Sequence, residues 1–454
     1  MPAKVRDTRP AGSSERASSL AVWAWVLYDF SNTIFSVSIL TVFFPLWVEG
    51  EVGGGAWLVN AATAVSALLV FFTAPILGAV ADLRQRRVPY LVVLTLISVL
   101  LTALLDVAGG ILVGVALFVA ADLTYQSAIV FYNALLPGVA AGRGAGKISG
   151  YGTAAGYVGT ILALIFLTFF VSDAATVRSI LGPLGGWVET GGEQNQNAFL
   201  PTAVLYLAFS LPAFFFVPDP AVRAPRPVAL GVAYRDVVST VKNLRRYAGM
   251  GTFILATILY MDAANTAVSN MALYGREVFG MGSTQVRNLL LFSTIFAVVG
   301  SAASGFATDR VGPKKTLLAV LALWLVSISL VAAAPAPWTL FLAGPLVGIA
   351  LGGTWTVSRV MLVALSPPEK VGEFFGLFSL AGRFSAVLGP AVTAVLLLVL
   401  GRGATAYRIS IGSLAVIMAL GFFFLSRVPD ARPDRTVDEF ASEALGGTTV
   451  DSSA

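Results

Sequence analysis

The stretch Gly305-Phe-Ala-Thr-Asp309-Arg310-Val-Gly312-Pro313-Lys314-Lys315 lies between two apolar runs, residues 286–308 and 316–334. A short segment rich in charge, glycine and proline between two long apolar runs is typical of the connection between two membrane-spanning helices. An earlier segment, Gly78-Ala-Val-Ala-Asp82-Leu83-Arg84-Gln85-Arg86-Arg87, repeats the glycine, the aspartate and the basic residues at an offset of 227. The pair of segments predicts a duplicated unit of membrane helices.

The composition of the 454-residue chain excludes an ordinary soluble protein. Hydrophobic residues make up 57% and charged residues 12% of the chain, against about 45–50% and about 25% in soluble domains. The chain has neither Cys nor His, which excludes disulfides, thiol nucleophiles and zinc–thiolate sites and leaves proton chemistry to carboxylates. The net charge of +5 is modest and its basic residues lie in short groups, so nucleic-acid binding is not expected.

Twelve apolar runs are long enough to cross a bilayer, at about 20 residues each. We expect spans at residues 23–48, 57–81, 89–108, 111–136, 149–171 and 198–217, then 249–273, 286–308, 316–334, 338–365, 376–400 and 408–426. The expected architecture is therefore all-α and integral to the membrane, with two six-helix bundles at 23–220 and 248–427. A linker at 221–247 and two polar tails, 1–22 and 428–454, complete the chain.

The distribution of Lys and Arg predicts the orientation. Because the number of spans is even, both termini lie on one side, and the segments on that side hold 22 of the 29 basic residues. The opposite loops hold five, which are Arg178, Arg276, Arg287, Arg402 and Arg408. By the positive-inside rule, both tails and the linker are cytoplasmic. We expect a multi-pass protein of the cell membrane.

Further repeats support the duplication. The pattern Asp29-x-x-Asn32-Thr33-x-x-Ser36 recurs as Asp262-x-x-Asn265-Thr266-x-x-Ser269, and the sequence at 112–117 recurs at 346–351. Gly150 and Gly156 recur as Gly376 and Gly382. Because a six-helix unit returns the chain to its starting side, the two copies are parallel, which is one of the known architectures of transporters.

The segment at 305–315 resembles the loop signature of the major facilitator superfamily, in which a glycine, three residues, an aspartate and a basic residue precede a glycine and a basic pair. The copy at 78–87 departs from it, because Leu83 and Gln85 stand where the family has a basic residue and a glycine. A finer resemblance comes from Trp25-Val-Leu-Tyr28-Asp29-Phe-Ser-Asn32 and Phe131-Tyr132-Asn133-Ala-Leu-Leu136-Pro137. These are similar to the vacuole-effluxer-like branch, the autophagy-related amino-acid permeases and their bacterial relatives.

The resemblance implies a major facilitator fold, in which two six-helix bundles rock about a midplane cavity lined by spans 1, 4, 7 and 10. It also implies that the loop signature is a latch between the bundles. The gating residues would then be Gly78, Asp82, Arg86, Gly305, Asp309, Arg310, Gly312 and Lys314. The alternative is that the basic residues only anchor the helices at the membrane surface.

Charged residues inside the expected spans point to the site of transport, because each costs at least about 2.5–3.5 kcal/mol in the bilayer centre. Five lie well inside: Asp29, Asp122, Asp262, Arg359 and Arg383. The first four fall on the spans that the resemblance assigns to the cavity. Arg383 has no clear role in the sequence.

Helical spacing places polar neighbours beside four of these charges. The predicted substrate- and proton-binding residues are Asp29, Asn32, Asp122, Gln126, Asn133, Asp262, Asn265, Trp355 and Arg359. We expect Asp29 or Asp262 to carry a proton, and Arg359 to hold an anionic group of the substrate. An ion pair of Arg359 with Asp122 or Asp262 would form in one conformation and break in the other. Interhelical hydrogen bonding without a transport role is the alternative.

These observations predict a secondary active transporter, not an enzyme, that exports a small polar metabolite such as an amino acid by alternating access with proton coupling. Its partners would be the substrate, protons and the lipid bilayer, with no cofactor, no metal and no nucleic acid, and we expect a monomer. Sodium stays open as the coupling ion. The alternatives are efflux of amphipathic drugs and a receptor or scaffold that does not transport.

Overall fold

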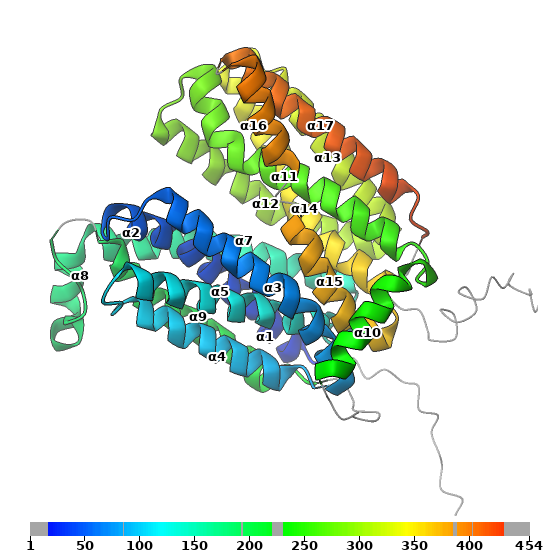
Figure 1. Cartoon of the computed structure of the whole chain (residues 1–454), viewed down its shortest axis with the longest axis horizontal. Helices are drawn as coiled ribbons and strands as arrows, with labels where there is room; N and C mark the ends of the chain where they lie inside the picture. Colours follow the sequence, from blue (N-terminus) through cyan, green and yellow to red (C-terminus); the bar gives the residue numbers. More distant parts are fainter. Residues whose placement is uncertain are drawn as a thin grey trace, which may run out of the picture.

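The computed structural model describes residues 17–84, 86–191, 194–219, 230–384, 388–401 and 403–430. Within these ranges the chain is helical and contains no β-strand. Twelve helical segments are long and apolar enough to cross a membrane, which confirms the predicted fold class (Figure 1). The two tails beyond residues 17 and 430, and the start of the expected linker, lie outside the described residues.

The first six spans follow the predicted order. The first runs through α1 (Ser19–Phe35), the π-helix η1 (Ser36–Phe43) and α2 (Phe44–Gly50), and it begins where the Ser18 hydroxyl accepts a hydrogen bond from the Ala21 amide. The others are α3 (Ala56–Arg84), α4 (Val88–Leu105), α5 (Ile111–Ala134), α7 (Ala145–Ser172) and α9 (Phe199–Phe216). Short helices α6 (Leu136–Val139) and α8 (Ala174–Leu181) lie in the connections.

The last six spans form the second bundle. They are α11 (Met250–Phe279), α12 (Ser283–Val311), α13 (Pro313–Ala332), α14 (Pro337–Leu365), the pair α15 (Val371–Phe384) and α16 (Leu388–Leu400), and α17 (Ala404–Ser426). Gly312 separates α12 from α13 with φ at +92°, a conformation that favours glycine. The linker contributes the helix α10 (Leu230–Lys242), which packs on α3.

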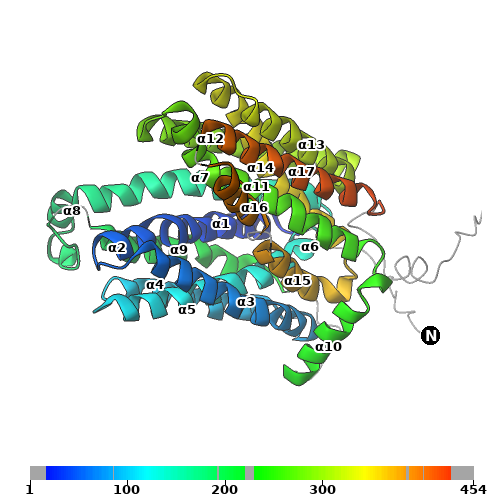
Figure 2. The same ribbon diagram turned by 45° about the horizontal axis from the view of Figure 1, so that its top comes forward.

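The two bundles converge at one end of the molecule. We call the end at which α1 begins and α17 finishes the termini end, and the opposite end the far end. Figures 1 and 2 show α15 and α10 lying against the first bundle at the termini end, while α16 and the end of α11 tilt away from it. The helix α7 of the first bundle lies beside α12 of the second.

Glycines permit this convergence. A Cβ at Gly150 of α7 would lie 2.7 Å from the Ser301 carbonyl oxygen of α12, and one at Gly305 would lie 2.5 Å from the Gly146 carbonyl oxygen. On the other side of the molecule, a Cβ at Gly376 of α15 would lie 2.6 Å from the Ala74 carbonyl oxygen of α3. The bundles therefore meet backbone to backbone at the termini end, where only glycine fits.

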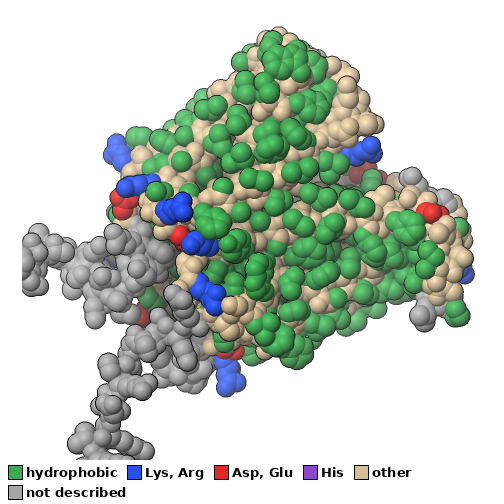
Figure 3. Space-filling model, turned by 180° about the vertical axis from the view of Figure 1, so that it is seen from behind, with side chains coloured by type: hydrophobic (Ala, Val, Ile, Leu, Met, Phe, Trp, Pro, Cys, Tyr) green, Lys and Arg blue, Asp and Glu red, His purple; other side chains and the backbone are tan. Residues whose placement is uncertain are grey.

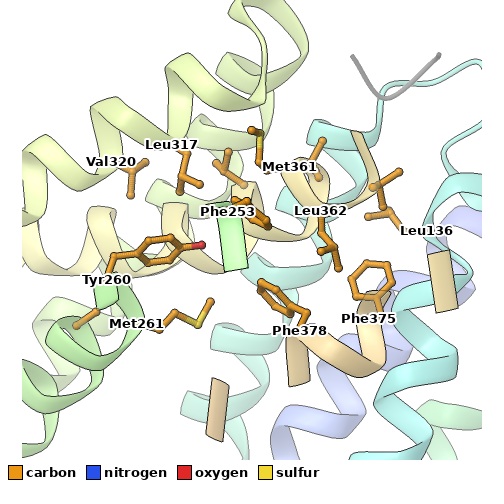
Figure 4. Close-up of a cluster of buried hydrophobic side chains, with 14 of the residues drawn as sticks. Leu136, Phe253, Tyr260, Met261, Leu317, Val320, Met361, Leu362, Phe375 and Phe378 are labelled. Atoms are coloured by element: carbon orange, nitrogen blue, oxygen red, sulfur yellow. The ribbon is translucent and has the colours of Figure 1, made fainter. Parts of the chain in front are cut away.

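A hydrophobic cluster also joins the bundles at the termini end (Figure 4). It includes Phe253, Leu362 and Phe375 of the second bundle together with Leu136 of the first, and each is 1% exposed or less. Large apolar side chains fully buried between two bundles exclude water and hold the contact closed.

The outer surface has the polarity of a membrane protein. Figure 3 shows hydrophobic side chains over the middle of the visible face, with Lys and Arg gathered at its edges, most of them beside the grey residues at the termini end. Exposed apolar side chains include Phe215 at 76% and Leu398 at 83%. A band of this kind suits contact with lipid rather than water.

Candidate functional site

An ion pair joins the two bundles near the middle of the molecule. Nη2 of Arg359, on α14, lies 2.9 Å from Oδ2 of Asp29, on α1. The same nitrogen donates to the hydroxyl of Thr153 on α7, also at 2.9 Å. Arg359 is 8% and Asp29 6% exposed, so both charges are held away from solvent and depend on each other.

Neighbouring residues orient this pair. Asn32 donates from Nδ2 to the second carboxylate oxygen of Asp29 at 3.2 Å. The Trp25 ring lies 5.9 Å from the Arg359 guanidinium carbon and is stacked on Tyr132 at 4.5 Å between ring centroids. Nη1 of Arg359 is buried and has no hydrogen-bond partner among the described residues. The guanidinium thus keeps one donor available to an anionic ligand.

A second polar group surrounds Asp122 on α5. Its carboxylate accepts hydrogen bonds from Ser66 of α3 at 2.5 Å and from Gln126 at 3.1 Å. Arg383 of α15 approaches it at 3.7 Å, also across the bundle interface. Among the described residues, both ion pairs that join the bundles therefore take the carboxylate from the first bundle and the arginine from the second.

In this conformation Arg359 pairs with Asp29, and not with Asp122 or Asp262 as expected for one of the two conformations. The physical reason is the direction in which the helices face. Arg359 is on the side of α14 that meets α1 and α7, whereas Asp122 is on the side of α5 that meets α3 and α15.

Asp262 and Asn265 lie on α11 in the second bundle. Asp262 is fully buried, and Asn265 is half-buried. A Cβ at Gly389 of α16 would lie 2.7 Å from Oδ2 of Asp262, so this carboxylate packs against α16. The hydrogen bonds of Arg359 in the described part of the chain go to Asp29 and Thr153, and not to Asp262.

Two other predicted residues share no hydrogen bond with either ion pair in the described part of the chain. Asn133 is 11 residues beyond Asp122 on α5, which is about 16 Å further toward the termini end at 1.5 Å per residue. Trp355 is 37% exposed. The aromatic ring over the Arg359 guanidinium is Trp25, although Trp355 is the aromatic residue that helical spacing pairs with it.

The aspartates of the two loop segments bind the opposite bundle. Asp82, at the end of α3, accepts the backbone amides of Gly372 and Glu373 at 2.9 and 2.7 Å, in the first turn of α15. Asp309, at the end of α12, accepts those of Gly146 and Lys147 at 2.8 and 3.0 Å, in the first turn of α7. Each carboxylate thus caps a helix N-terminus, where unpaired amides and the helix dipole favour an anion.

The remaining latch residues divide into those at the contact and those outside it. Gly78 faces the Gly372 backbone of α15 and Gly305 faces Gly146. Arg87, not Arg86, pairs with Asp82, at 3.1 Å, and it also donates to the Ala134 carbonyl oxygen. Arg86 and Arg310 are exposed, and Gly312 and Lys314 are half-buried at the turn into α13.

Sequence reasoning assigned no role to four residues around these groups: Trp25, Arg87, Thr153 and Arg383, the last of which it singled out only as an intramembrane charge. Trp25 lies four residues before Asp29 on the same helical face, which is a signal that could have identified it. Thr153 carries no such signal, because its partner is on a helix 206 residues away.

One repeat was misaligned. Gly156 packs on Thr33, and the glycine that packs on the equivalent Thr266 is Gly389, not Gly382. The offset is 226 between Gly150 and Gly376 but 233 between Gly156 and Gly389. Seven additional residues therefore lie in this part of the second copy, where α15 ends and α16 begins.

Comparison with known proteins identifies the relatives of this chain. The family described as "Vacuole effluxer Atg22 like" matches residues 141–437. The "Uncharacterized MFS-type transporter YxiO" of Bacillus subtilis is 23% identical over 418 residues, which cover 90% of this chain and 94% of that protein. The "Multidrug resistance protein MdtG" of Salmonella paratyphi C is 27% identical over 50% of this chain and 55% of that protein.

A crystal structure of FucP, the fucose:proton symporter of E. coli, has the same fold. It superposes with a TM-score of 0.68 at 14% sequence identity, covering 90% of this chain and 98% of that chain. The fold is therefore that of the major facilitator transporters, as the loop signature predicted.

Proposed function

Because the chain belongs to the vacuole effluxer Atg22-like family of major facilitator transporters, we propose that it carries a small polar metabolite of the amino-acid class, in exchange with protons. Secondary transport is the activity that its relatives support. The substrate class and the coupling rest on the buried ion pair between Arg359 and Asp29, and this pair is the observation that carries the proposal.

The pair gives a direct means of coupling. A zwitterionic amino acid fits this pair, with its carboxylate on Arg359 and its ammonium on Asp29. A proton on Asp29 removes the charge that holds the ammonium, so proton and substrate compete for Asp29, as exchange requires. The substrate carboxylate then takes the place of Asp29 on the guanidinium. Since the two residues belong to different bundles, exchanging one anion for the other also changes the force that holds the bundles together.

The latches set the conformation in which this exchange occurs. In this structure Asp82 and Asp309 both bind the opposite bundle at the termini end, so the ion pair is closed off from that end. Access then comes from the far end, and breaking the two caps opens the termini end. The gating role of these residues is part of the proposal.

The basic residues favour placing the termini end in the cytoplasm. We propose that the protein acts as a monomer in the cell membrane and exports its substrate while protons enter. Protons are the proposed coupling ion because a single carboxylate, Asp29, is enough to bind and release them. FucP, which has the same fold, is a proton symporter by its name.

The experiment is a proton-flux assay in proteoliposomes that contain the pH dye pyranine. Each of the twenty amino acids is added under an imposed pH gradient. At least one should accelerate proton movement, and Asp29→Asn and Arg359→Gln should each abolish the acceleration. Asp173→Asn, the same change at an exposed residue of the far end, is the control. Full flux with Asp29→Asn would refute the coupling role.

A second candidate, efflux of amphipathic compounds, is favoured by the similarity to MdtG, a multidrug resistance protein by its name. The measurement that distinguishes it is the transport of a hydrophobic cation such as ethidium. This candidate predicts that the Arg359→Gln variant still transports ethidium. A metabolite carboxylate needs the guanidinium, whereas a hydrophobic cation does not.

A further inference from the structure

A cavity opens between the bundles at the far end. It has a volume of about 300 Å³ and lies between Ile161 and Leu164 of α7 and Leu290 and Leu291 of α12. Arg287 contributes the charged group of its lining. We call this cavity the lateral groove, because its walls are the two helices that meet side by side at one edge of the bundle interface (Figures 1 and 2).

The sequences of α7 and α12 explain why the groove is at this end. Toward the termini end the facing residues are Gly146, Gly150, Ser301 and Gly305, which bring the two backbones into contact. Toward the far end most of the facing residues are leucine, isoleucine and valine. The two helices therefore meet closely at one end, and their large side chains hold them apart at the other.

The dimensions of the lateral groove fit one leaflet of a membrane. On α12 its lining runs from Ser283, the first residue of the helix, to Thr294. The 11 residue steps between them rise about 16 Å, which is about half of the roughly 30 Å hydrocarbon thickness of a bilayer. The groove therefore extends from the far membrane surface to about the midplane.

The polarity of the lateral groove changes along its length. Arg287 lies at the surface end and is exposed. At the inner end, the Thr160 and Thr294 hydroxyls donate to carbonyl oxygens of their own helices, at 3.2 and 2.8 Å. No carboxylate lines the groove. The ligand that fits is a long apolar chain with an anionic group at its surface end.

We propose that the lateral groove binds an anionic phospholipid of the far leaflet, with one acyl chain between α7 and α12 and the phosphate on Arg287. We favour this ligand over a polar metabolite for two reasons. The positive charge of Arg287 at the surface end complements a phosphate, and the groove is as deep as one leaflet. The groove shares no residue with the Arg359 and Asp122 groups, so the inference does not depend on the substrate of transport.

The bound lipid stabilises the conformation seen here. The walls belong to different bundles, so a movement that brings the far halves together narrows the groove and expels the chain. A ligand that binds one conformation more tightly shifts the population toward it. The anionic lipid therefore holds the far end open and the termini end closed.

The test measures lipid retention by native mass spectrometry of the purified full chain, with dioleoyl phosphatidylglycerol or dioleoyl phosphatidylcholine added. The chain should retain phosphatidylglycerol in preference, and Arg287→Gln should weaken that retention about fivefold, as expected for one cation at a membrane surface. Arg276→Gln removes an exposed cation of the same bundle outside the groove, and it should have no effect.

A second variant tests the position of the chain. Thr294→Phe adds a ring at the inner end and should lower retention of both lipids, whereas Arg287→Gln affects only the anionic one. Arg287 is exposed and Thr294 half-buried, so both variants should unfold at the temperature of the parent chain. Equal phosphatidylglycerol retention by Arg287→Gln and the parent, or undiminished retention by Thr294→Phe, overturns the proposal.

Discussion

The latch at Asp82 gives the most quantitative prediction. Asp82→Asn should shift the conformational equilibrium toward opening of the termini end. The carboxylate accepts two amides of the other bundle, and these bonds exist only while that end is closed. Its pairing with Arg87 is within one bundle, so losing it affects both conformations alike.

The magnitude follows from the bonds that cross the interface. A hydrogen bond to a charged group contributes about 1.5–3 kcal/mol, and a neutral one about 0.5–1.5 kcal/mol. An asparagine side chain has one acceptor oxygen, which can bind only one of the two backbone amides. Its NH₂ group then faces the second amide, which is also a donor. The closed conformation should lose about 2 kcal/mol relative to the open one, which is about a 30-fold increase in the open population.

The assay uses the absence of cysteine from the chain. Ser149→Cys introduces a single thiol at a fully buried residue of α7 whose hydroxyl donates to the Thr356 carbonyl oxygen of the other bundle. The rate of its modification by a membrane-impermeant maleimide is compared in inside-out and right-side-out vesicles. Asp82→Asn should accelerate labelling by about 30-fold, and only from the side that faces the termini end.

The matched control is Asp219→Asn. Asp219 accepts the backbone amides of Arg87 and Val88 at 2.6 and 2.8 Å, at the start of α4. It therefore provides the same chemistry as Asp82, but within one bundle, and its replacement should leave the labelling rate unchanged. An equal acceleration by both variants would show that general loosening, not loss of an interbundle contact, exposes the thiol. No acceleration by Asp82→Asn would refute the latch.

Three further predictions follow from particular contacts. Gly305→Ala places a Cβ 2.5 Å from the Gly146 carbonyl oxygen and, at about 1–3 kcal/mol for overpacking, should accelerate labelling of Ser149→Cys at least fivefold. Gly412→Ala, whose nearest neighbour would be 3.7 Å away, should not. Arg359→Gln should lower the unfolding temperature more than Arg383→Gln. The reasons are that the Arg359 ion pair is closer, 2.9 against 3.7 Å, and that Asp122 keeps its hydrogen bonds from Ser66 and Gln126 when Arg383 is replaced. The reverse order of unfolding temperatures in a thermal melt would contradict this. Burial, with a smaller contribution from the charge of Glu189, raises the pKa of Asp106 at the end of α4 to about 7. Since the folded chain then binds this proton more tightly than the unfolded chain does, stability should fall as the pH rises from about 4 to 7 and level off above. Asp106→Asn should remove this part of the pH dependence, and an unchanged pH profile of the unfolding temperature would contradict the assignment.

The fold was accessible from the sequence because its signals are local. Apolar runs of sufficient length specify the spans, and the loop aspartates Asp82 and Asp309 lie at the helix ends where the superfamily signature places them. The candidate site was only partly accessible. Intramembrane charge selects Asp29, Asp122, Asp262 and Arg359, but helical spacing cannot show which neighbouring helix a side chain meets.

What the sequence by itself determined is the number and length of the membrane helices, their duplication, and the charged residues that the spans must accommodate, since each of these depends on hydropathy along one segment. The tertiary structure decided which charges meet. Asp29 and Arg359 are 330 residues apart, and their contact depends on how α1, α7 and α14 face one another across the bundle interface. The same packing of the two bundles brings Arg383 to Asp122 and forms the lateral groove between α7 and α12. Contacts between two bundles depend on three-dimensional packing, and they produce no periodic pattern in the sequence.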